Sequence, residues 1–148
     1  MARARAKPKP ARRFVLDCSV VLAWYFADES DPFADSVAAA LVTATALVPS
    51  LFHLEIANIL VVGERRNRST EAQATAFLTR LAGLPIVVDG QTVARAWFDT
   101  IALARAHGLS MYDSAYLELA VRESAPLATL DDKLKNAAKA IGIPIFST

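Results

Sequence analysis

Residues 13–17 read Arg-Phe-Val-Leu-Asp, and residues 18–27 continue with Cys-Ser-Val-Val-Leu-Ala-Trp-Tyr-Phe-Ala. The first run is short, apolar and rich in residues that favour strands, and it ends at an aspartate. The second run predicts a helix over 19–27, so the chain opens with a strand, an acidic residue and a helix. In parallel α/β sheets the residues that follow the strands line the functional edge. This opening therefore predicts a fold class and a place for Asp17 within it.

The same alternation of short apolar runs and helical stretches continues along the rest of the chain. It predicts strands over 46–48, 86–88, 127–130 and 143–146, and helices over 33–46, 50–66, 69–81, 92–107, 110–123 and 131–141. Two helices usually separate consecutive strands, which favours parallel pairing with helices over both faces of the sheet. We expect an α/β protein with a Rossmann-like parallel sheet in three layers, α/β/α.

Length and composition restrict the class of protein further. A chain of 148 residues with 54% hydrophobic residues is long enough for one domain with its own core. The single cysteine, Cys18, excludes an internal disulfide and a cysteine-based zinc site, which favours a reducing compartment. The longest apolar run, 20–27, falls far short of the ~20 residues of a membrane span. Asp17 interrupts the apolar start, so we expect no signal peptide and a cytoplasmic protein.

Charge is divided unevenly between a short basic stretch and an acidic body. Residues 1–13 carry six basic residues and no acidic ones, whereas residues 14–148 carry ten basic and fifteen acidic residues, a net charge of −5. The prolines and the lack of apolar periodicity predict a disordered basic tail over 1–12 and a folded domain over 13–148. The tail either binds nucleic acid through counterion release or only solubilises the chain. The acidic body argues against a sequence-reading DNA-binding domain.

Two aspartates directly follow predicted strands. Asp17 comes after the first strand and Asp131 after the strand over 127–130, so both should lie at carboxyl ends of the sheet. Both also precede predicted helices, where aspartate is a favoured N-cap, and capping is the alternative interpretation of each. Asp132 competes with Asp131 for either role.

Two further acidic residues lie on predicted helices. Asp113 is the third residue after Ser110, a spacing that also fits a capping box, yet it shares its helix face with apolar residues. Glu55 is too far inside its helix to be a cap, and Asn58 lies one turn further on the same side. The stripe expected to face the core contains Glu55 together with Leu51, Ile59 and Val62. A surface glutamate is the alternative for Glu55.

The four acidic residues suggest a shared chemistry. Carboxylates within ~4–6 Å of one another cannot all stay ionised without a compensating cation or protonation. An oxygen-only set favours Mg²⁺ or Mn²⁺ over zinc, and such ions serve phosphate chemistry. Phosphate-binding glycine loops and a serine nucleophile elbow are absent from the sequence. The aromatic residues on helices are expected in the core, namely Trp24, Tyr25, Trp97 and Phe98, and Cys18 is expected to be a small buried residue.

Four sequence blocks contain these residues, and the order and spacing of the blocks agree with those of a known family. They are V-L-D-C-S-V-V-L-A-W with Asp17 and Ser19, L-E-I-A-N-I-L with Glu55 and Asn58, L-S-M-Y-D-S-A-Y-L-E-L-A with Asp113, and L-A-T-L-D-D-K-L-K-N-A-A-K-A-I-G-I with Thr129 and Asp131. From residue 14 to residue 146 the chain resembles PIN-domain ribonucleases, and within them the VapC-like toxins of prokaryotic toxin–antitoxin pairs.

The resemblance implies a PIN-like fold and a metal-dependent endoribonuclease that leaves 3′-hydroxyl and 5′-phosphate ends. The acidic quartet of the family corresponds to Asp17, Glu55, Asp113 and Asp131. Mg²⁺ or Mn²⁺ is then expected on the three aspartates, while Glu55 orients or deprotonates the attacking water. Ser19, Asn58 and Thr129 match the supporting polar positions of the family.

The same resemblance implies partners: an RNA substrate, a cognate antitoxin that blocks the site, and a second copy in a homodimer. Candidate phosphate contacts are basic residues near the predicted site, although a solvated helix end is the alternative for most of them: Arg65, Arg66, Arg68, Lys133 and Lys135. Two other functions stay open, a non-catalytic PIN-like module that binds RNA or protein, and a nuclease of the same fold that matures RNA or acts on another phosphate substrate.

Overall fold

The structure is a computed structural model that describes residues 12–148, so residues 1–11 of the predicted basic tail lie outside the described residues. Arg12, which we assigned to the tail, belongs to the folded body instead. Its guanidinium donates to the carbonyl oxygen of Ser147 at 2.7 Å and lies 5.0 Å from the centre of the Phe146 ring. Its carbonyl oxygen also accepts a hydrogen bond from the Thr45 N–H, so the fold begins one residue earlier than predicted.

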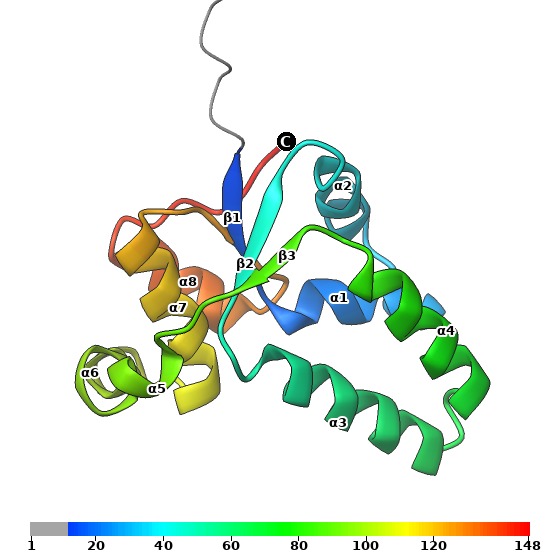
Figure 1. The fold of residues 1–148 in the computed structure, drawn as a ribbon. Coiled ribbons are helices and arrows are strands. Elements are labelled where there is room, and N and C mark those ends of the chain that lie inside the picture. The colour runs from blue at the N-terminus through cyan, green and yellow to red at the C-terminus, as the bar shows by residue number, and fades with distance from the viewer. Residues whose placement is uncertain (1–11) are drawn as a thin grey trace, which may run out of the picture.

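A parallel sheet of four strands forms the centre of the protein (Figure 1). The strands are β1 (Arg13–Leu16), β2 (Thr45–Val48), β3 (Ile86–Val88) and β4 (Leu127–Ala128), in the spatial order β3-β2-β1-β4. The chain adds β2 and β3 on one side of β1 and returns to add β4 on the other. The strand order therefore reverses between β1 and β4, the place where α/β sheets open a crevice at their carboxyl ends.

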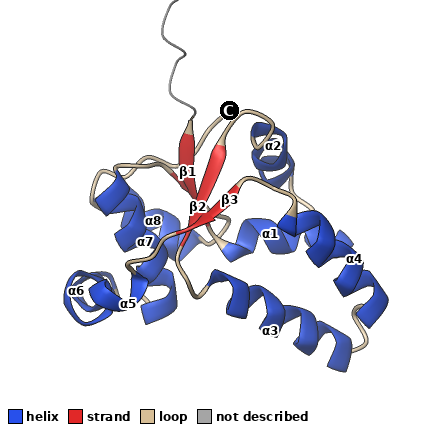
Figure 2. Cartoon of the chain, in the orientation of Figure 1, coloured by secondary structure: helices blue, strands red, loops and turns tan. Residues whose placement is uncertain are grey.

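Helices lie on both sides of the sheet, which confirms the three-layer α/β/α class (Figure 2). They are α1 (Cys18–Tyr25), α2 (Pro32–Ala40), α3 (Phe52–Arg65), α4 (Glu71–Ala82), α5 (Thr92–Arg95), α6 (Ile101–His107), α7 (Met111–Glu123) and α8 (Asp132–Ala140). A 3₁₀ turn spans Ala27–Glu29 and a π-helical turn spans Ala96–Thr100. Within residues 12–148 no helix has the length and apolar character needed to cross a membrane.

The core is built around β1 and α7. The β1 side chains Phe14, Val15 and Leu16 are fully buried, as expected for a central strand with helices on both faces. The middle of α7 is buried on every side, from Ser114 to Ala120, which places this helix inside the protein rather than on its surface. Residues that directly follow β1 or lie on α7 are therefore attached to the most densely packed part of the molecule.

Two predicted helices are shorter or less regular than expected. The helix predicted over 33–46 ends at Ala40, since β-branched residues follow and Thr45 already pairs with Arg13 in the sheet. The helix predicted over 92–107 is interrupted by the π-helical turn. Trp97 and Phe98 in that turn are 85% and 72% exposed, so the prediction that they lie in the core is wrong.

Strand ends also differ from the prediction. β4 stops at Ala128, and beyond it the Thr129 side chain and the Leu130 N–H bond to Asp17 and Ser19 at the junction of β1 and α1. The strand predicted over 143–146 is reduced to a single bridge between Leu127 and Ile145, next to Pro144. Ser50 does not cap α3, since the helix starts at Phe52 without a side-chain cap. The Ser50 N–H donates instead to the Thr92 hydroxyl at 2.9 Å.

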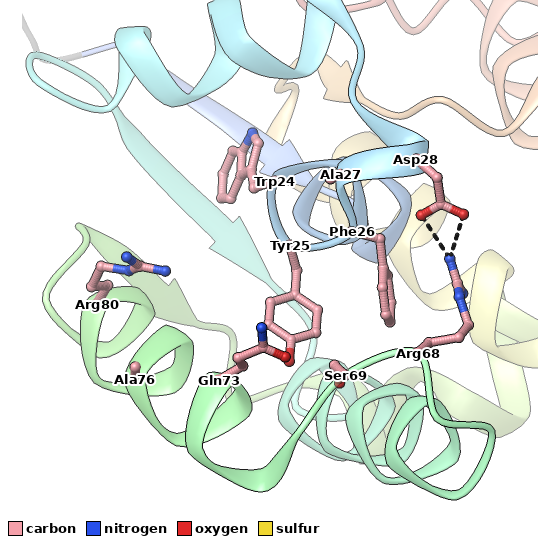
Figure 3. Close-up of a pocket in the computed structure, with 10 residues that line it drawn as sticks. All are labelled: Trp24, Tyr25, Phe26, Ala27, Asp28, Arg68, Ser69, Gln73, Ala76 and Arg80. Atoms are coloured by element: carbon pink, nitrogen blue, oxygen red, sulfur yellow. Dashed lines mark hydrogen bonds and ion pairs between the residues drawn. The ribbon is translucent and has the colours of Figure 1, made fainter.

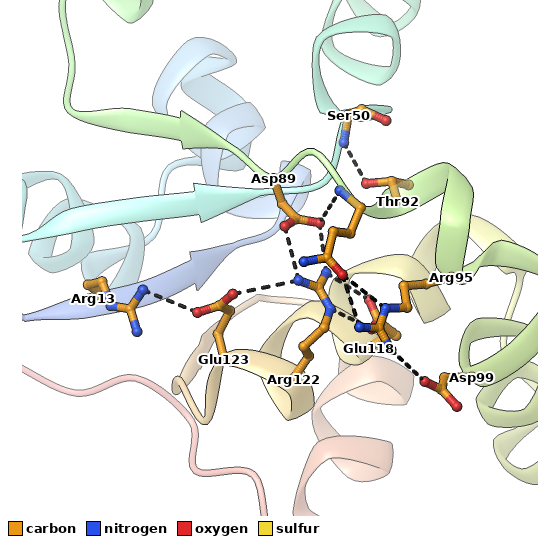
Figure 4. Close-up of polar contacts among 10 residues, drawn as sticks. Arg13, Ser50, Asp89, Thr92, Arg95, Asp99, Glu118, Arg122 and Glu123 are labelled. Carbon is orange, nitrogen blue, oxygen red and sulfur yellow. Dashed lines mark hydrogen bonds and ion pairs between the residues drawn. The ribbon is translucent and has the colours of Figure 1, made fainter.

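A nearly buried ion-pair network fastens α7 to the end of β3 (Figure 4). Arg122 donates to both carboxylate oxygens of Asp89, at 3.0 and 2.7 Å, and to Glu118 at 2.8 Å. The hydrogen bonds from Arg122 hold the pKa of the Asp89 carboxyl below its usual value. The network fixes the last turn of α7, whereas the residues of the predicted site lie toward its first turns.

Candidate active site

Asp17 lies at the end of β1 and is held by hydroxyl groups. Ser19 Oγ donates to Asp17 Oδ2 at 2.6 Å, and Thr129 Oγ1 donates to the same oxygen at 2.8 Å. The two hydroxyls also accept the N–H groups of Leu130 and Asp131, at 2.9 and 3.0 Å. The Asp17 side chain makes no capping bond to α1, so the capping interpretation is wrong for this residue.

The carboxyl of Asp17 is buried, and burial raises its pKa from 3.8 to about 6 despite the two hydroxyl donors. The negative charges of Asp113 and Glu55 raise it further. The charges of Asp17, Glu55 and Asp113 therefore influence one another's protonation. A buried carboxylate of this kind is stable as an anion only beside a compensating positive charge.

Glu55 projects from α3 into a set of buried hydrogen-bond donors. Tyr116 Oη donates to Glu55 Oε1 at 2.7 Å, and Cys18 Sγ lies 3.5 Å from the same oxygen and 3.0 Å from the tyrosine oxygen. Burial raises the pKa of Glu55, the two donors lower it, and the charge of Asp113 raises it. The carboxylate is half-buried, so the surface interpretation is wrong, but the stripe that faces the core is one residue further along: Phe52, Ile56, Leu60 and Gly63.

Asp113 lies in the first turn of α7. Ser110 caps this helix by accepting from the Asp113 N–H at 3.1 Å, but the reciprocal bond of a capping box, from the Ser110 N–H to the Asp113 carboxylate, is not formed. The carboxylate is half-buried, and burial raises its pKa, followed by the charge of Asp131. The side chain of Ser110 lowers this pKa in turn, so the carboxyl interacts both with its cap residue and with Asp131.

Asp131 follows β4 and does act as an N-cap. Its Oδ1 accepts from the Leu134 N–H at 2.8 Å, and its side chain is exposed. The negative charge of Asp131 raises the pKa of Asp113, so Asp131 interacts electrostatically with the acidic group. Asp132 points to solvent with 94% of its side chain exposed, 4.0 Å from Lys135. Of the two neighbouring aspartates, the structure brings Asp131 to the acidic group.

Two supporting positions contribute and one does not. Ser19 and Thr129 hold Asp17 as described above, and their hydroxyls lie 3.3 Å apart. Asn58 is exposed and, among residues 12–148, makes no side-chain hydrogen bond to the acidic residues. The sequence analysis expected Cys18 to be a small buried residue and gave Tyr116 no role, so it missed the contacts of both with Glu55. The i, i+3 spacing of Asp113 and Tyr116 on one helix face was the signal that they share a site.

The described residues do not form a finished metal site. In the part of the chain from 12 to 148, no group of three His, Cys, Asp or Glu side chains stands ready to hold a metal ion. No ion pair in the same range reaches the four acidic residues, so the buried Asp17 has no cationic partner there. Magnesium commonly binds through one or two carboxylates and keeps several waters. The oxygen-only donor set thus fits such an ion chemically without enclosing it.

The candidate phosphate-binding residues are scattered. Arg68 is exposed but already paired, because it donates to both oxygens of Asp28 at 3.0 and 3.1 Å and lies 3.9 Å over the Phe26 ring. Arg65 and Arg66 are exposed at the end of α3, away from β1. Lys133 is exposed in the first turn of α8, and its charge lowers the pKa of Asp113. Lys133 therefore acts on one of the four acidic residues of the predicted site, whereas Arg68 pairs with Asp28 and Lys135 lies 4.0 Å from Asp132.

A cavity of about 600 Å³ lies away from the acidic residues (Figure 3). It is bounded by the end of α1 with its 3₁₀ turn and by α4, and Trp24, Arg68 and Arg80 contribute to its wall. The hydroxyls of Tyr25 and Ser69, which also line it, are buried without a hydrogen-bond partner among the described residues. No pattern in the sequence predicts this cavity, and Asp17 is not among the residues that line it.

The parallel sheet with its acidic edge defines a class of α/β proteins, and comparison with known proteins identifies it. The model of the PIN domain family matches residues 14–140, and the chain belongs to this family. Ribonuclease VapC3 of Pyrobaculum aerophilum is 30% identical over 132 residues, which cover 89% of this chain and 99% of the relative. The crystal structure of PAE2754 from Pyrobaculum aerophilum shares the fold, with a TM-score of 0.61, 21% identity and 86% of each chain covered.

Proposed function

We propose that the protein is a metal-dependent endoribonuclease that acts as the toxin of a toxin–antitoxin pair. The observation that carries this proposal is the electrostatic coupling of Asp17, Glu55 and Asp113, which come from three different elements beside the β1–β4 crevice. Membership of the PIN family and the likeness to a VapC ribonuclease support the reaction class. The fold by itself would not select a substrate.

In this proposal Asp17, Asp113 and Asp131 hold Mg²⁺ or Mn²⁺. The buried Asp17 carboxylate supplies a negative charge at a fixed position, because Ser19 and Thr129 both donate to Oδ2. No side-chain donor in the described chain binds Oδ1. Asp131 has one oxygen engaged by the Leu134 N–H, which leaves Oδ2 for the site. The chemistry that such a cation supplies when bound is polarisation of a phosphoryl oxygen and activation of water.

Glu55 is assigned the orientation of the attacking water and acceptance of its proton. Its raised pKa brings the carboxylate closer to the range in which a general base works near neutral pH. Oε1 is engaged by Tyr116 and Cys18, so Oε2 is the oxygen left for this role. Lys133 is proposed to contact an RNA phosphate, since it is exposed and lies near Asp113.

The partners follow from the same proposal. An RNA substrate and a cognate antitoxin are proposed from the likeness to a VapC protein, together with a cytoplasmic location. A homodimer is proposed as well, supported by the apolar side chains exposed around the π-helical turn. These are Val93, Trp97 and Phe98, which are 84%, 85% and 72% exposed.

Cleavage of a mixed RNA pool by purified, antitoxin-free protein tests the proposal. We expect discrete cleavage with Mg²⁺ or Mn²⁺ and none with excess EDTA. Asp113→Asn should lower the rate by more than about 100-fold, because even loss of the outer partners of metal ligands costs 10–100-fold. Asp113→Asn keeps the shape of the side chain, and circular dichroism checks that the variant is folded.

Asp131→Asn and Asp132→Asn form a matched pair. Asparagine preserves the cap of α8, so Asp131→Asn should impair cleavage without unfolding the helix. Asp132→Asn removes the same charge at an exposed neighbour and should leave the rate within about twofold of the wild type. Cleavage that persists in EDTA or in Asp113→Asn would refute the nuclease mechanism. RNA binding without cleavage by folded, metal-loaded protein would instead indicate a binding module.

A further inference from the structure

We propose that Tyr116 is a positioning residue that, together with Cys18, holds the carboxylate of Glu55 in one orientation. This inference rests on the proposed function, because Glu55 matters only if the acidic group is catalytic. The observation behind it is a buried chain of contacts in which three side chains from α1, α3 and α7 meet. Neither Tyr116 nor Cys18 contacts Asp17, Asp113 or Asp131 through its side chain among the described residues.

The geometry directs the hydroxyl hydrogen of Tyr116 to Glu55 and leaves the thiol of Cys18 two possible partners. Tyr116 Oη donates its proton to Glu55 Oε1 over 2.7 Å, a short distance typical of a donor to a charged oxygen. Cys18 Sγ lies 3.0 Å from the tyrosine oxygen and 3.5 Å from Glu55 Oε1, so its hydrogen can point to either acceptor. Tyr116 is therefore the donor that holds Glu55 Oε1, and the Cys18 thiol lies within reach of both oxygens.

The position of the tyrosine is fixed by its surroundings. Tyr116 is completely buried and Cys18 is 6% exposed, whereas Glu55 is only half-buried. A fully packed ring cannot change rotamer without disturbing the core, so its hydroxyl defines a fixed point. The flexible Glu55 side chain is thus hydrogen-bonded to the rigid interior through Oε1. This contact sets the direction in which Oε2 points.

The contact also links two acidic residues through one helix. Tyr116 and Asp113 lie three residues apart on α7, on the same face, so the same backbone sets the positions of the tyrosine hydroxyl and the aspartate. A shift of α7 would move Asp113 and, through Tyr116, Glu55 together. Misplacement of a catalytic group by about 1 Å can cost about 100-fold in rate, which gives such a tether functional weight.

Tyr116→Phe is the direct test, because it removes only the hydroxyl and keeps the buried ring. The chain has three tyrosines, and the other two provide matched controls. Tyr112 lies on the same helix but is 63% exposed, and the Tyr25 hydroxyl is buried but has no partner among the described residues. We expect Tyr116→Phe to lower kcat by about tenfold or more with KM unchanged, while Tyr112→Phe and Tyr25→Phe match the wild type.

A second measurement needs neither RNA nor metal. Thermal unfolding in EDTA is compared for the wild type, Tyr116→Phe, Glu55→Ala and the double variant, because alanine removes the oxygen that accepts from Tyr116. If the tyrosine acts through Glu55, the shifts in Tm are not additive, and the double variant differs from Glu55→Ala by less than Tyr116→Phe differs from the wild type. Additive shifts would overturn the inference.

The outcomes separate this inference from the proposed function. If the wild type cleaves RNA and Tyr116→Phe behaves like Tyr112→Phe, the positioning role is refuted while the nuclease stands. A rise in KM with unchanged kcat would also refute it, since that pattern indicates lost substrate binding rather than a misplaced base. If the wild type cleaves no RNA, the nuclease proposal fails, and the unfolding cycle still decides whether Tyr116 and Glu55 are coupled.

Discussion

Replacing Asp17 by asparagine should stabilise the metal-free protein at neutral pH. Asp17 is 5% exposed, and its pKa in the folded protein is about 6, compared with 3.8 as the ordinary value. A pKa that is raised on folding means that the folded state binds the proton more tightly than the unfolded state. The stability that protonated Asp17 contributes is therefore complete below pH ~4 and is lost as the pH rises through about 6.

The size of the effect follows from the same two pKa values. The difference of 6 minus 3.8 corresponds to about 3 kcal/mol at 1.36 kcal/mol per unit. Asparagine carries no charge at any pH and its amide oxygen can still accept from Ser19 and Thr129. For a domain of 148 residues, 3 kcal/mol corresponds to a rise in Tm of roughly 6–12 °C.

Differential scanning calorimetry of wild type and Asp17→Asn in EDTA measures this rise at pH 7.5 and at pH 4. At pH 4 the difference between the two proteins should fall below about 1 kcal/mol, because folded Asp17 is already neutral there. Asp132→Asn is the control and should change Tm little at either pH. A lower Tm for Asp17→Asn at pH 7.5, or the same gain at both pH values, would contradict the reasoning. Adding Mn²⁺ should raise the Tm of the wild type and leave that of Asp17→Asn almost unchanged.

Three further variants test the surrounding structure. Ser19→Ala removes a donor to Asp17 and leaves a main-chain N–H unpaired, so the free energy of unfolding in urea should fall by about 1–3 kcal/mol, with the pH dependence from Asp17 displaced upward. Arg122→Met leaves Asp89 and Glu118 nearly buried and unpaired, and should cost about 3–5 kcal/mol in the same assay; a loss under 1 kcal/mol would contradict the importance of that network. Trp97→Ser changes a side chain that is 85% exposed, so the unfolding free energy of the monomer should stay within about 0.5 kcal/mol. Sedimentation of the same variant should show weaker self-association if the proposed homodimer uses this surface.

The sequence predicted the class of the fold because its strands are short, apolar and followed by recognisable turns. It also placed Asp17 correctly at the end of β1, since a short, continuously apolar strand bounded by an acidic residue has few other interpretations. The buried stripe of α3 was displaced by one residue, because Glu55 and its neighbours lie at the border between two faces of the helix. A difference of 100° in helix orientation changes which residue counts as buried, and only tertiary packing decides it.

Other features depend on contacts between distant segments and have no local signature. Tyr116 lies among apolar residues in the sequence and so looks like a core residue. Its hydroxyl acquires a hydrogen-bond partner only when α3 packs beside α7. The residues that follow the short β4, Thr129 and Leu130, bond to Asp17 and Ser19 at the junction of β1 and α1, more than 100 residues earlier. The exposure of Trp97 was also missed, because amphipathic patterns assume a regular helix and the π-helical turn breaks that regularity.

The position of Asp17 also has a consequence for hydrogen exchange. Its main-chain N–H donates to the Ala128 carbonyl at 3.0 Å, beside the central strand of the sheet. Exposing that amide to solvent requires β1 and β4 to separate, and β1 is fully packed on both faces. Its exchange should therefore proceed only through global unfolding, with the full unfolding free energy as its protection. Under the proposed function, β1 and β4 would form a rigid base of the site. An antitoxin would then inhibit by covering the crevice and not by separating these two strands.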